Sequence, residues 1–314
     1  MRNRCIAIMV SKKLISRKFP PYLPFDSGRF RLSMGLLSLN LVDWLEPDEL
    51  FHEELLEKES LLHNIFDEVF QAREGSQLAQ QEVLELLIDH MTKVYPELLQ
   101  EEVSKITIKQ TGRMFLKKGF CEAPLNLAGR IVQEDLCLMA PGPNGYTLEA
   151  ASLCFPSRWR LLEKIGKPMI DIHSPVPGYK DKLVRPVDRF LDRLVIEKPV
   201  WRVNWSLTDD ATLYQPIRNT EIESKQSINI QNVGEEVFLR CERQTLRRLP
   251  NSGWILFTIK TYLDKISKLS IKPGAARDLA SLVRDLPDDM LLYKNIAPYQ
   301  KSLLYYLDQI TAEQ

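Results

Sequence analysis

Histidine and cysteine, which often bind transition metals, are scarce in this chain of 314 residues. It has five cysteines and four histidines. No cysteine pair has the C-x-x-C spacing of a zinc site, a dithiol redox site or an iron–sulfur cluster. The cysteines are also far apart in the sequence and odd in number, which favours reduced thiols in the cytosol.

The chain also lacks an excess of charge of either sign. Its 42 Lys and Arg residues balance 42 Asp and Glu residues, so we expect binding neither to nucleic acid nor to a membrane surface. No apolar segment approaches the length of a membrane span. The basic segment 1–18 has only a short apolar run, so we expect a flexible tail on a cytoplasmic protein. Organelle targeting by this tail is the weaker alternative.

Hydrophobic periodicity predicts helices near both ends of the chain. Apolar residues from Phe51 to Val69 recur at helical spacing, and a second such run lies between Gly75 and Pro96. We expect further helices after Pro156-Ser157, from Pro186, and in the segment 266–314.

Alternation of apolar and polar residues predicts strands in the middle of the chain. The predicted strands span residues 135–140, 146–155, 200–207, 237–249 and 254–262. This order of elements indicates an α+β fold, in which helices flank a five-stranded antiparallel sheet. Such a half-barrel can hold a flat apolar cofactor between its concave face and the intervening helices.

His173 is the best candidate site residue, because it lies in a turn framed by prolines, IHSPVPGY, over residues 172–179. The other histidines, His52, His63 and His90, lie among acidic residues of the predicted amino-terminal helices. We expect them to be solvated surface groups.

Several motifs occur in an order that resembles one known family. They are Phe25-Asp26-Ser27-Gly28, PSRW with Arg158-Trp159, IHSPVPGY, Asn204-Trp205, and ERQTLRRLP from Glu242 to Pro250. Together they resemble the alpha-subunit family of haem-dependent oxidative N-demethylases, formerly a family of unknown function. The resemblance covers roughly residues 20 to 265.

The resemblance implies a PAS-like haem-binding core over residues 119–265. A helical region over 19–118 would precede it, and C-terminal helices over 266–314 would follow it. It also implies a haem b enzyme that oxidises a methyl group of a small secondary amine with dioxygen and releases formaldehyde. The chain has no GxGxxG, P-loop or GxSxG motif. Its electrons would therefore come from a separate flavin or iron–sulfur reductase.

Two other functions remain open at this point. A non-catalytic haem sensor or scaffold of the same fold would keep His173 but would need no carboxylate for a substrate. A cofactor-free interaction protein would retain no haem.

A haem iron needs an axial donor, and the neutral imidazole of His173 in a rigid loop is suitable. The alternative for His173 is a loop histidine that caps backbone groups. Cys154 and Cys241 compete as ligands, although a cysteine on an apolar strand is usually a core residue. The haem propionates call for arginines, whose planar fork fits a carboxylate. The candidate cofactor-binding residues besides His173 are Arg158, Arg160, Arg247, Arg248 and Tyr179.

A protonated amine substrate requires a carboxylate that binds it and helps its proton leave. Glu242 is the first candidate for this catalytic role and Asp171 the second, although a structural salt bridge is an equally good reading of Glu242. Strand alternation puts Arg243 and Arg247 on one face and Glu242 and Arg248 on the other, and the sequence leaves open which face lines the pocket. Three tryptophans, Trp201, Trp205 and Trp254, form either an apolar wall over the substrate or part of the core.

Overall fold

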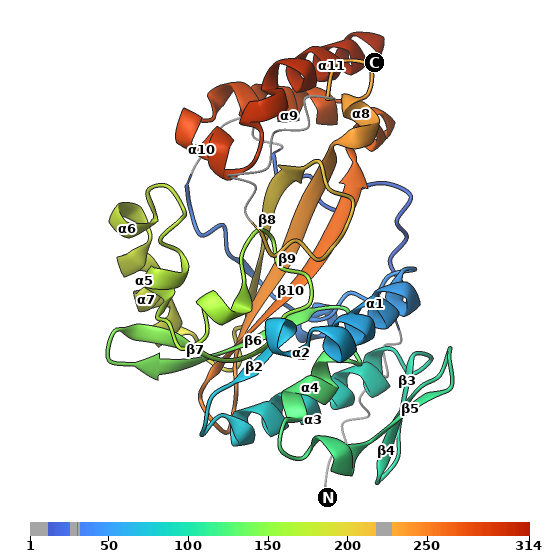
Figure 1. Ribbon diagram of the computed structural model, residues 1–314, viewed down its shortest axis with the longest axis vertical. Helices are drawn as coiled ribbons and strands as arrows, with labels where there is room; N and C mark the ends of the chain where they lie inside the picture. Colours follow the sequence, from blue (N-terminus) through green and yellow to red (C-terminus); the bar gives the residue numbers. More distant parts are fainter. Residues whose placement is uncertain (1–11, 26–29, 31, 218–227) are drawn as a thin grey trace, which may run out of the picture.

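The computed structural model describes residues 12–25, 30, 32–217 and 228–314. Figure 1 shows a long sheet with the amino-terminal elements at one end and the carboxy-terminal helices at the other. Residues 1–11 of the predicted tail lie outside the described residues. Asp26, Ser27 and Gly28 of the first family motif lie outside them as well.

The sheet is antiparallel, and its seven strands follow the order β1-β8-β9-β10-β6-β7-β2. All five predicted strands are present, and the α+β class is confirmed. The sheet nevertheless has seven strands rather than five. The two additional strands, at its edges, are too short to show a two-residue period in the sequence. The strands are β1 (Leu37–Ser38), β2 (Phe70–Ala72), β6 (Asp135–Gly142), β7 (Gly145–Ser152), β8 (Val200–Thr208), β9 (Phe238–Arg248) and β10 (Ile255–Lys265).

The amino-terminal region contains the predicted helices and also a second sheet. Its helices are α1 (Phe51–Asn64), α2 (Phe66–Val69), α3 (Gln77–Val94) and α4 (Pro124–Gly129). The small sheet has the order β3-β4-β5 and consists of β3 (Leu99–Glu101), β4 (Lys105–Ile108) and β5 (Arg113–Leu116). These strands of three or four residues are too short to show a clear two-residue period, so the sequence did not predict them.

Three short helices lie beside the sheet in Figure 1: α5 (Met169–Ile172), α6 (Tyr179–Lys182) and α7 (Val184–Arg193). The predicted α-helix after Pro156-Ser157 is wrong, since only a 3-10 turn forms there, η3 (Leu161–Glu163). Arg158 has a φ of 62°, which an α-helix does not tolerate. The Arg158 amide donates to the Gln215 carbonyl oxygen instead.

The carboxy-terminal segment is helical, as predicted. Apolar residues of its helices pack with the ends of β8, β9 and β10 into one buried cluster. The elements are α8 (Val233–Glu236), η4 (Ile266–Ile271), α9 (Ala275–Asp285), α10 (Asp288–Tyr293), η5 (Ala297–Tyr299) and α11 (Gln300–Glu313).

The two faces of the sheet have different neighbours. The register pairs Arg202 with Gln244 and Asn204 with Glu242, so these four side chains share one face. We call it the His173 face, because its apolar residues pack with those of α5 and α7. We call the opposite side, which carries Arg243, Arg247 and Lys260, the core face.

Ionic contacts fasten the amino-terminal region to the core face. Arg243 donates to the carbonyl oxygens of Trp44 and Asp43, at 2.9 and 2.5 Å. The buried Lys260 ammonium binds Glu54 at 2.6 Å and lies 3.3 Å from Asp48. These contacts occupy Arg243 and Lys260 of the core face. The His173 face is the candidate for a ligand site, because it carries the predicted site residues His173 and Glu242.

Candidate functional site

The His173 ring is oriented by the last turn of α5. Its Nδ1 lies 3.0 Å from the Met169 carbonyl oxygen. Because a carbonyl oxygen only accepts, Nδ1 carries the proton and donates it. Nε2 is then the atom with the free lone pair, and it has no hydrogen-bond partner among the described residues. Burial lowers the pKa of His173 to about 4, so the ring is neutral near pH 7.

Tyr179 supports this ring from one side. The two rings are stacked, with 4.7 Å between their centroids and 15° between their planes. Gly178, with a φ of 73°, makes the turn that brings Tyr179 back to His173. The Tyr179 hydroxyl is buried and has no hydrogen-bond partner in the described structure. Burial raises the pKa of Tyr179 to about 12, so it keeps its proton at neutral pH.

Glu242 lies on the same face of the sheet. Its Oε2 accepts hydrogen bonds from Gln244 at 3.0 Å and from Asn204 at 3.4 Å. Its Oε1 is 3.7 Å from Arg240 Nε, which is beyond hydrogen-bond distance. The side chain is 13% exposed. The two amides therefore hold one carboxylate oxygen and leave the other without a short contact.

Two further cations lie at this site, Arg202 and Lys294, and neither was predicted from the sequence. Arg202 of β8 lies near enough to His173, Tyr179 and Glu242 to act on all three electrostatically. Lys294, just after α10, is buried, and its ammonium donates to the Trp205 carbonyl oxygen. Burial, followed by the charge of Arg202, lowers the pKa of Lys294 to about 7. The strand alternation already put Arg202 on the face of Asn204, but only the register brings both beside Glu242.

The four predicted arginines do not gather around His173. Arg247 points from the core face, with its guanidinium 4.5 Å from the centre of the Trp44 ring. Arg248 is on the His173 face but donates to the carbonyl oxygens of Leu191, Leu194 and Gly253 and to the Tyr146 hydroxyl.

The other two predicted arginines, Arg158 and Arg160, precede the His173 loop in the chain. Arg160 is exposed and lies 3.9 Å from Glu68. Arg158 is partly buried and acts electrostatically on Lys294. Of the four, Arg158 is therefore the one that stays near the group formed by Arg202, Lys294 and Glu242.

The remaining candidates separate clearly by burial. Asp171 is exposed on α5, two residues before His173. Cys154 and Cys241 are buried, and burial raises the pKa of both thiols, that of Cys154 to about 12. Of the tryptophans, Trp205 packs in the carboxy-terminal cluster, whereas Trp201 and Trp254 pack against the amino-terminal core. This placement agrees with the alternative in which these tryptophans and cysteines are core residues.

His90 is not the surface group that the sequence suggested. It is 9% exposed, and its ring lies edge-on to Trp44, with 5.3 Å between the ring centroids. The acidic neighbours of His90 in the sequence gave no sign of this, because α3 turns the ring toward the core instead.

Apolar side chains line the His173 face beside these polar groups. Met169 and Ile172 of α5, with Leu246 and Phe257 of the sheet, are partly buried against a core of fully buried residues. A neutral imidazole, a neutral phenol and an apolar floor therefore lie on the same face as Glu242 and Arg202.

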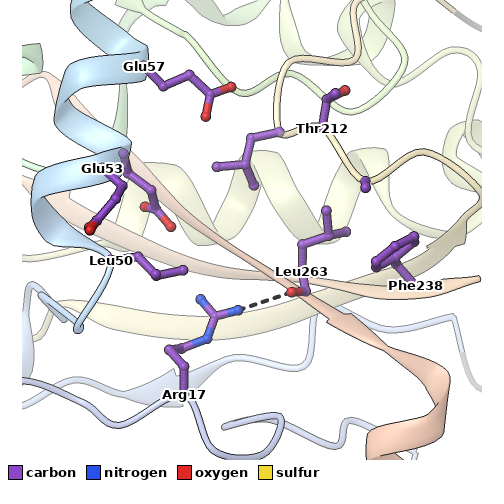
Figure 2. Close-up of a pocket in the computed structure, with 10 residues that line it drawn as sticks. Arg17, Leu50, Glu53, Glu57, Thr212, Phe238 and Leu263 are labelled. Carbon is purple, nitrogen blue, oxygen red and sulfur yellow. Dashed lines mark hydrogen bonds between the residues drawn. The ribbon is translucent and has the colours of Figure 1, made fainter. Parts of the chain in front are cut away.

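A separate pocket of about 410 Å³ lies between α1 and the segment 211–213 (Figure 2). In Figure 2, Glu53 and Glu57 project from α1, and Arg17 donates to the Leu263 carbonyl oxygen at 3.2 Å. Burial, followed by the charge of Glu54, raises the pKa of Glu57. None of the predicted site residues lines this pocket.

In the described part of the chain, no three His, Cys, Asp or Glu side chains come together in a way that could hold a metal ion. A haem iron needs only an axial side chain, because the porphyrin supplies four ligands. Residues 35–304 match the family described as haem-dependent oxidative N-demethylase, alpha subunit-like. The chain belongs to this family.

Membership of the N-demethylase alpha-subunit-like family confirms the resemblance seen in the motifs, and the match continues beyond residue 265 to residue 304. The family description names a haem-dependent oxidative enzyme and an alpha subunit, which indicates a system of more than one component. None of the helices formed by the described residues has both the length and the hydropathy needed to cross a bilayer.

Proposed function

We propose that this chain is the haem-binding subunit of an enzyme that removes a methyl group from a small secondary amine as formaldehyde. Dioxygen is the oxidant, and a separate flavin or iron–sulfur reductase supplies the electrons. The observation that supports the proposal most strongly is the hydrogen bond of the His173 ring, which leaves Nε2 unprotonated. Metal-binding histidines typically donate their other ring N–H to a carbonyl or carboxylate oxygen, and His173 donates to Met169 in this way.

The residues of the His173 face fit a haem. Its flat ring is apolar, as are Met169, Ile172, Leu246 and Phe257. Its propionates need donors, and the Tyr179 hydroxyl is a buried donor without a described partner. We propose haem b, because the chain has no C-x-x-C-H motif for covalent attachment. Bound haem supplies the activation of dioxygen and the oxidation at the methyl carbon.

Glu242 is proposed to take the proton that an ammonium substrate must lose. Gln244 and Asn204 hold Oε2 in place, so Oε1 is the oxygen that can accept this proton. Lys294, whose pKa is about 7, acts electrostatically on this carboxylate, and its own charge changes near neutral pH. Asp171 remains the second proposed carboxylate, at the exposed end of the His173 loop.

We also propose that the five long strands with α4 to α7 form a PAS-like haem core over residues 119–265. Residues 19–118 and 266–314 would then flank it as amino- and carboxy-terminal regions. The cytosol is the proposed compartment, because it keeps thiols such as the free Cys137, Cys154 and Cys241 reduced.

The test is haem uptake by the wild type, by His173→Ala and by His63→Ala, whose histidine is exposed on α1. We expect one haem per chain and a sharp Soret band in the wild type and in His63→Ala. In His173→Ala we expect loss or displacement of that band. Reductase-supported formaldehyde release from methylamines is then measured on the loaded protein.

Each outcome of this test has a separate meaning. An unchanged spectrum in His173→Ala would remove His173 as ligand and keep the haem. Haem uptake without formaldehyde from any methylamine would favour the sensor. No haem in any of the three proteins would overturn the proposed function.

A further inference from the structure

Arg202 and Arg247 differ from the other arginines of the large sheet, because no hydrogen bond or ion pair joins either to a described residue. The Arg247 guanidinium lies 4.5 Å from the centre of the Trp44 ring. Arg240 donates to the carbonyl oxygens of Phe155 and Leu213, and Arg243 and Arg248 are bonded to backbone oxygens in the same way. Arg202 makes no hydrogen bond and no ion pair with any described residue, and its Nε is buried without an acceptor. The Arg202 residue is half-buried, and a partly desolvated cation without a hydrogen-bond partner lowers the stability of a fold.

The charge around Arg202 is predominantly positive. Glu242 is the carboxylate that acts most on Arg202, and it also acts on Arg240 and Lys294. Arg202 and Lys294 therefore share Glu242, whereas Arg240 is also acted on by Asp135 and Asp210. An anion that enters here meets net positive charge and stabilises the site.

Arg202 also acts electrostatically on residues of the His173 loop. After burial and the Met169 hydrogen bond, Arg202 is the group that acts most on the pKa of His173, and it also acts on Tyr179. The Tyr179 hydroxyl is a buried donor without a described acceptor. The Arg202 guanidinium and the Tyr179 phenol, each with a buried donor atom that has no described acceptor, thus interact electrostatically beside the proposed axial histidine.

We propose that Arg202 and Tyr179 together bind a carboxylate in the His173 site. The inference rests on the proposed function and assigns to Arg202 the role that the sequence gave to Arg158, Arg160, Arg247 and Arg248. A guanidinium presents two parallel N–H groups to a carboxylate, and the phenol supplies a further donor. The carboxylate comes from one of two sources: a haem propionate, or an N-methyl amino acid that serves as the amine substrate.

The experiment compares wild type, Arg202→Gln and Arg185→Gln, a control on the exposed part of α7. The apoproteins are titrated with haem and with haem dimethyl ester, which lacks free propionates. If the carboxylate is a propionate, Arg202→Gln weakens haem binding by about 10- to 100-fold. The same change leaves binding of the ester as it is in wild type.

The second arm adds N-methylglycine or dimethylamine to the haem-loaded proteins and follows the Soret band. If the carboxylate belongs to the substrate, Arg202→Gln takes up haem normally. It then binds N-methylglycine about 10- to 100-fold more weakly, while its response to dimethylamine is unchanged.

The urea midpoint of the apoproteins separates a binding role from a structural one. Since Arg202 has no described partner, Arg202→Gln should keep or raise the midpoint, whereas the loss of a structural arginine lowers it. If Arg202→Gln does not fold, Arg202→Lys, which keeps the charge without the fork, takes its place in both arms.

Equal binding of haem, ester and N-methylglycine by wild type and variant would overturn the inference and leave the proposed function standing. A wild type without haem would overturn both. Arg202→Gln that binds as wild type but unfolds at lower urea would make Arg202 structural.

Discussion

Burial fixes the protonation of two histidines, one on each side of the sheet. It lowers the pKa of His173 and of His90 to about 4. His173 keeps a lone pair available at Nε2, whereas the Nε2 of His90 is enclosed beside Trp44. In both places the lowered pKa reduces stability in acid, and at His173 it also keeps a lone pair available for a ligand.

His90 should make the protein less stable in mild acid. Its folded pKa of about 4 lies below the ordinary value of 6.5, so the unfolded chain binds the proton first as the pH falls. After burial, the charges of Arg247 and Lys12 lower this pKa, and Asp89 opposes them. Above pH 6.5 His90 has no effect, and between pH 6.5 and 4 the free energy of unfolding falls by up to about 1.4 kcal/mol per pH unit.

The measurement is urea unfolding of wild type, His90→Gln and the exposed control His63→Gln at pH 7.5 and 5. The loss of stability between the two pH values should be smaller in His90→Gln and unchanged in His63→Gln. Equal losses in all three proteins would mean that His90 is not neutral in the fold.

The packing of α4 on β7 depends on a glycine at the last position of α4. A Cβ at Gly129 would lie 2.8 Å from the Ser152 Cβ and would also clash with its Oγ. We predict that Gly129→Ala lowers the free energy of unfolding by about 1–3 kcal/mol, as overpacking typically does. Gly119→Ala, with no atom within 4 Å of the added methyl group, should change it by less than about 0.5 kcal/mol. Equal urea midpoints for the two variants would show that α4 can move away from β7.

The elements that the sequence predicted well are those with a sustained period. Strands β8, β9 and β10 have nine to eleven residues each, and the helices α1 and α3 have fourteen and eighteen. The predicted helix after Ser157 failed because its neighbour in space, Gln215, takes the backbone bonds of Pro156 and Arg158. The sequence pattern around Ser157 cannot predict a contact with a residue so far away in the chain.

The residues of the candidate site were predictable from the sequence to a similar degree. His173, Tyr179 and Glu242 lie in short motifs, so the sequence proposed them as candidates, and the structure places all three at one face of the sheet. Arg202 alternates with apolar residues and reads as a solvated strand residue, while Lys294 follows α10 without a motif. The strand register brings Arg202 to Glu242. The carboxy-terminal chain returns to β8, where the Leu207 amide donates to the Lys294 carbonyl oxygen, and this brings Lys294 to the site.

At the scale of the whole molecule, the sheet separates two environments. The core face is covered at one end by α1, α3 and α4 and at the other by the carboxy-terminal helices, and its Lys260 is paired with Glu54. The His173 face is covered by the short helices α5 to α7, whose contacts with the sheet include many partly buried residues. Segments with few buried contacts open at low free energy, so α5 to α7 are the elements that a ligand should order most.

Removal of haem should therefore destabilise the protein and loosen one side of it. With free haem at about a thousand times its Kd, binding adds about 4 kcal/mol to the free energy of unfolding. We expect the holoprotein to melt several degrees above the apoprotein, and His173→Ala to lose most of this difference. Hydrogen exchange should slow on haem addition in α5 to α7 and in β8 and β9, and stay unchanged in α3 and α11. Slower exchange in α3 with unchanged exchange in α5 would mean that haem binds the core face, beside the buried His90.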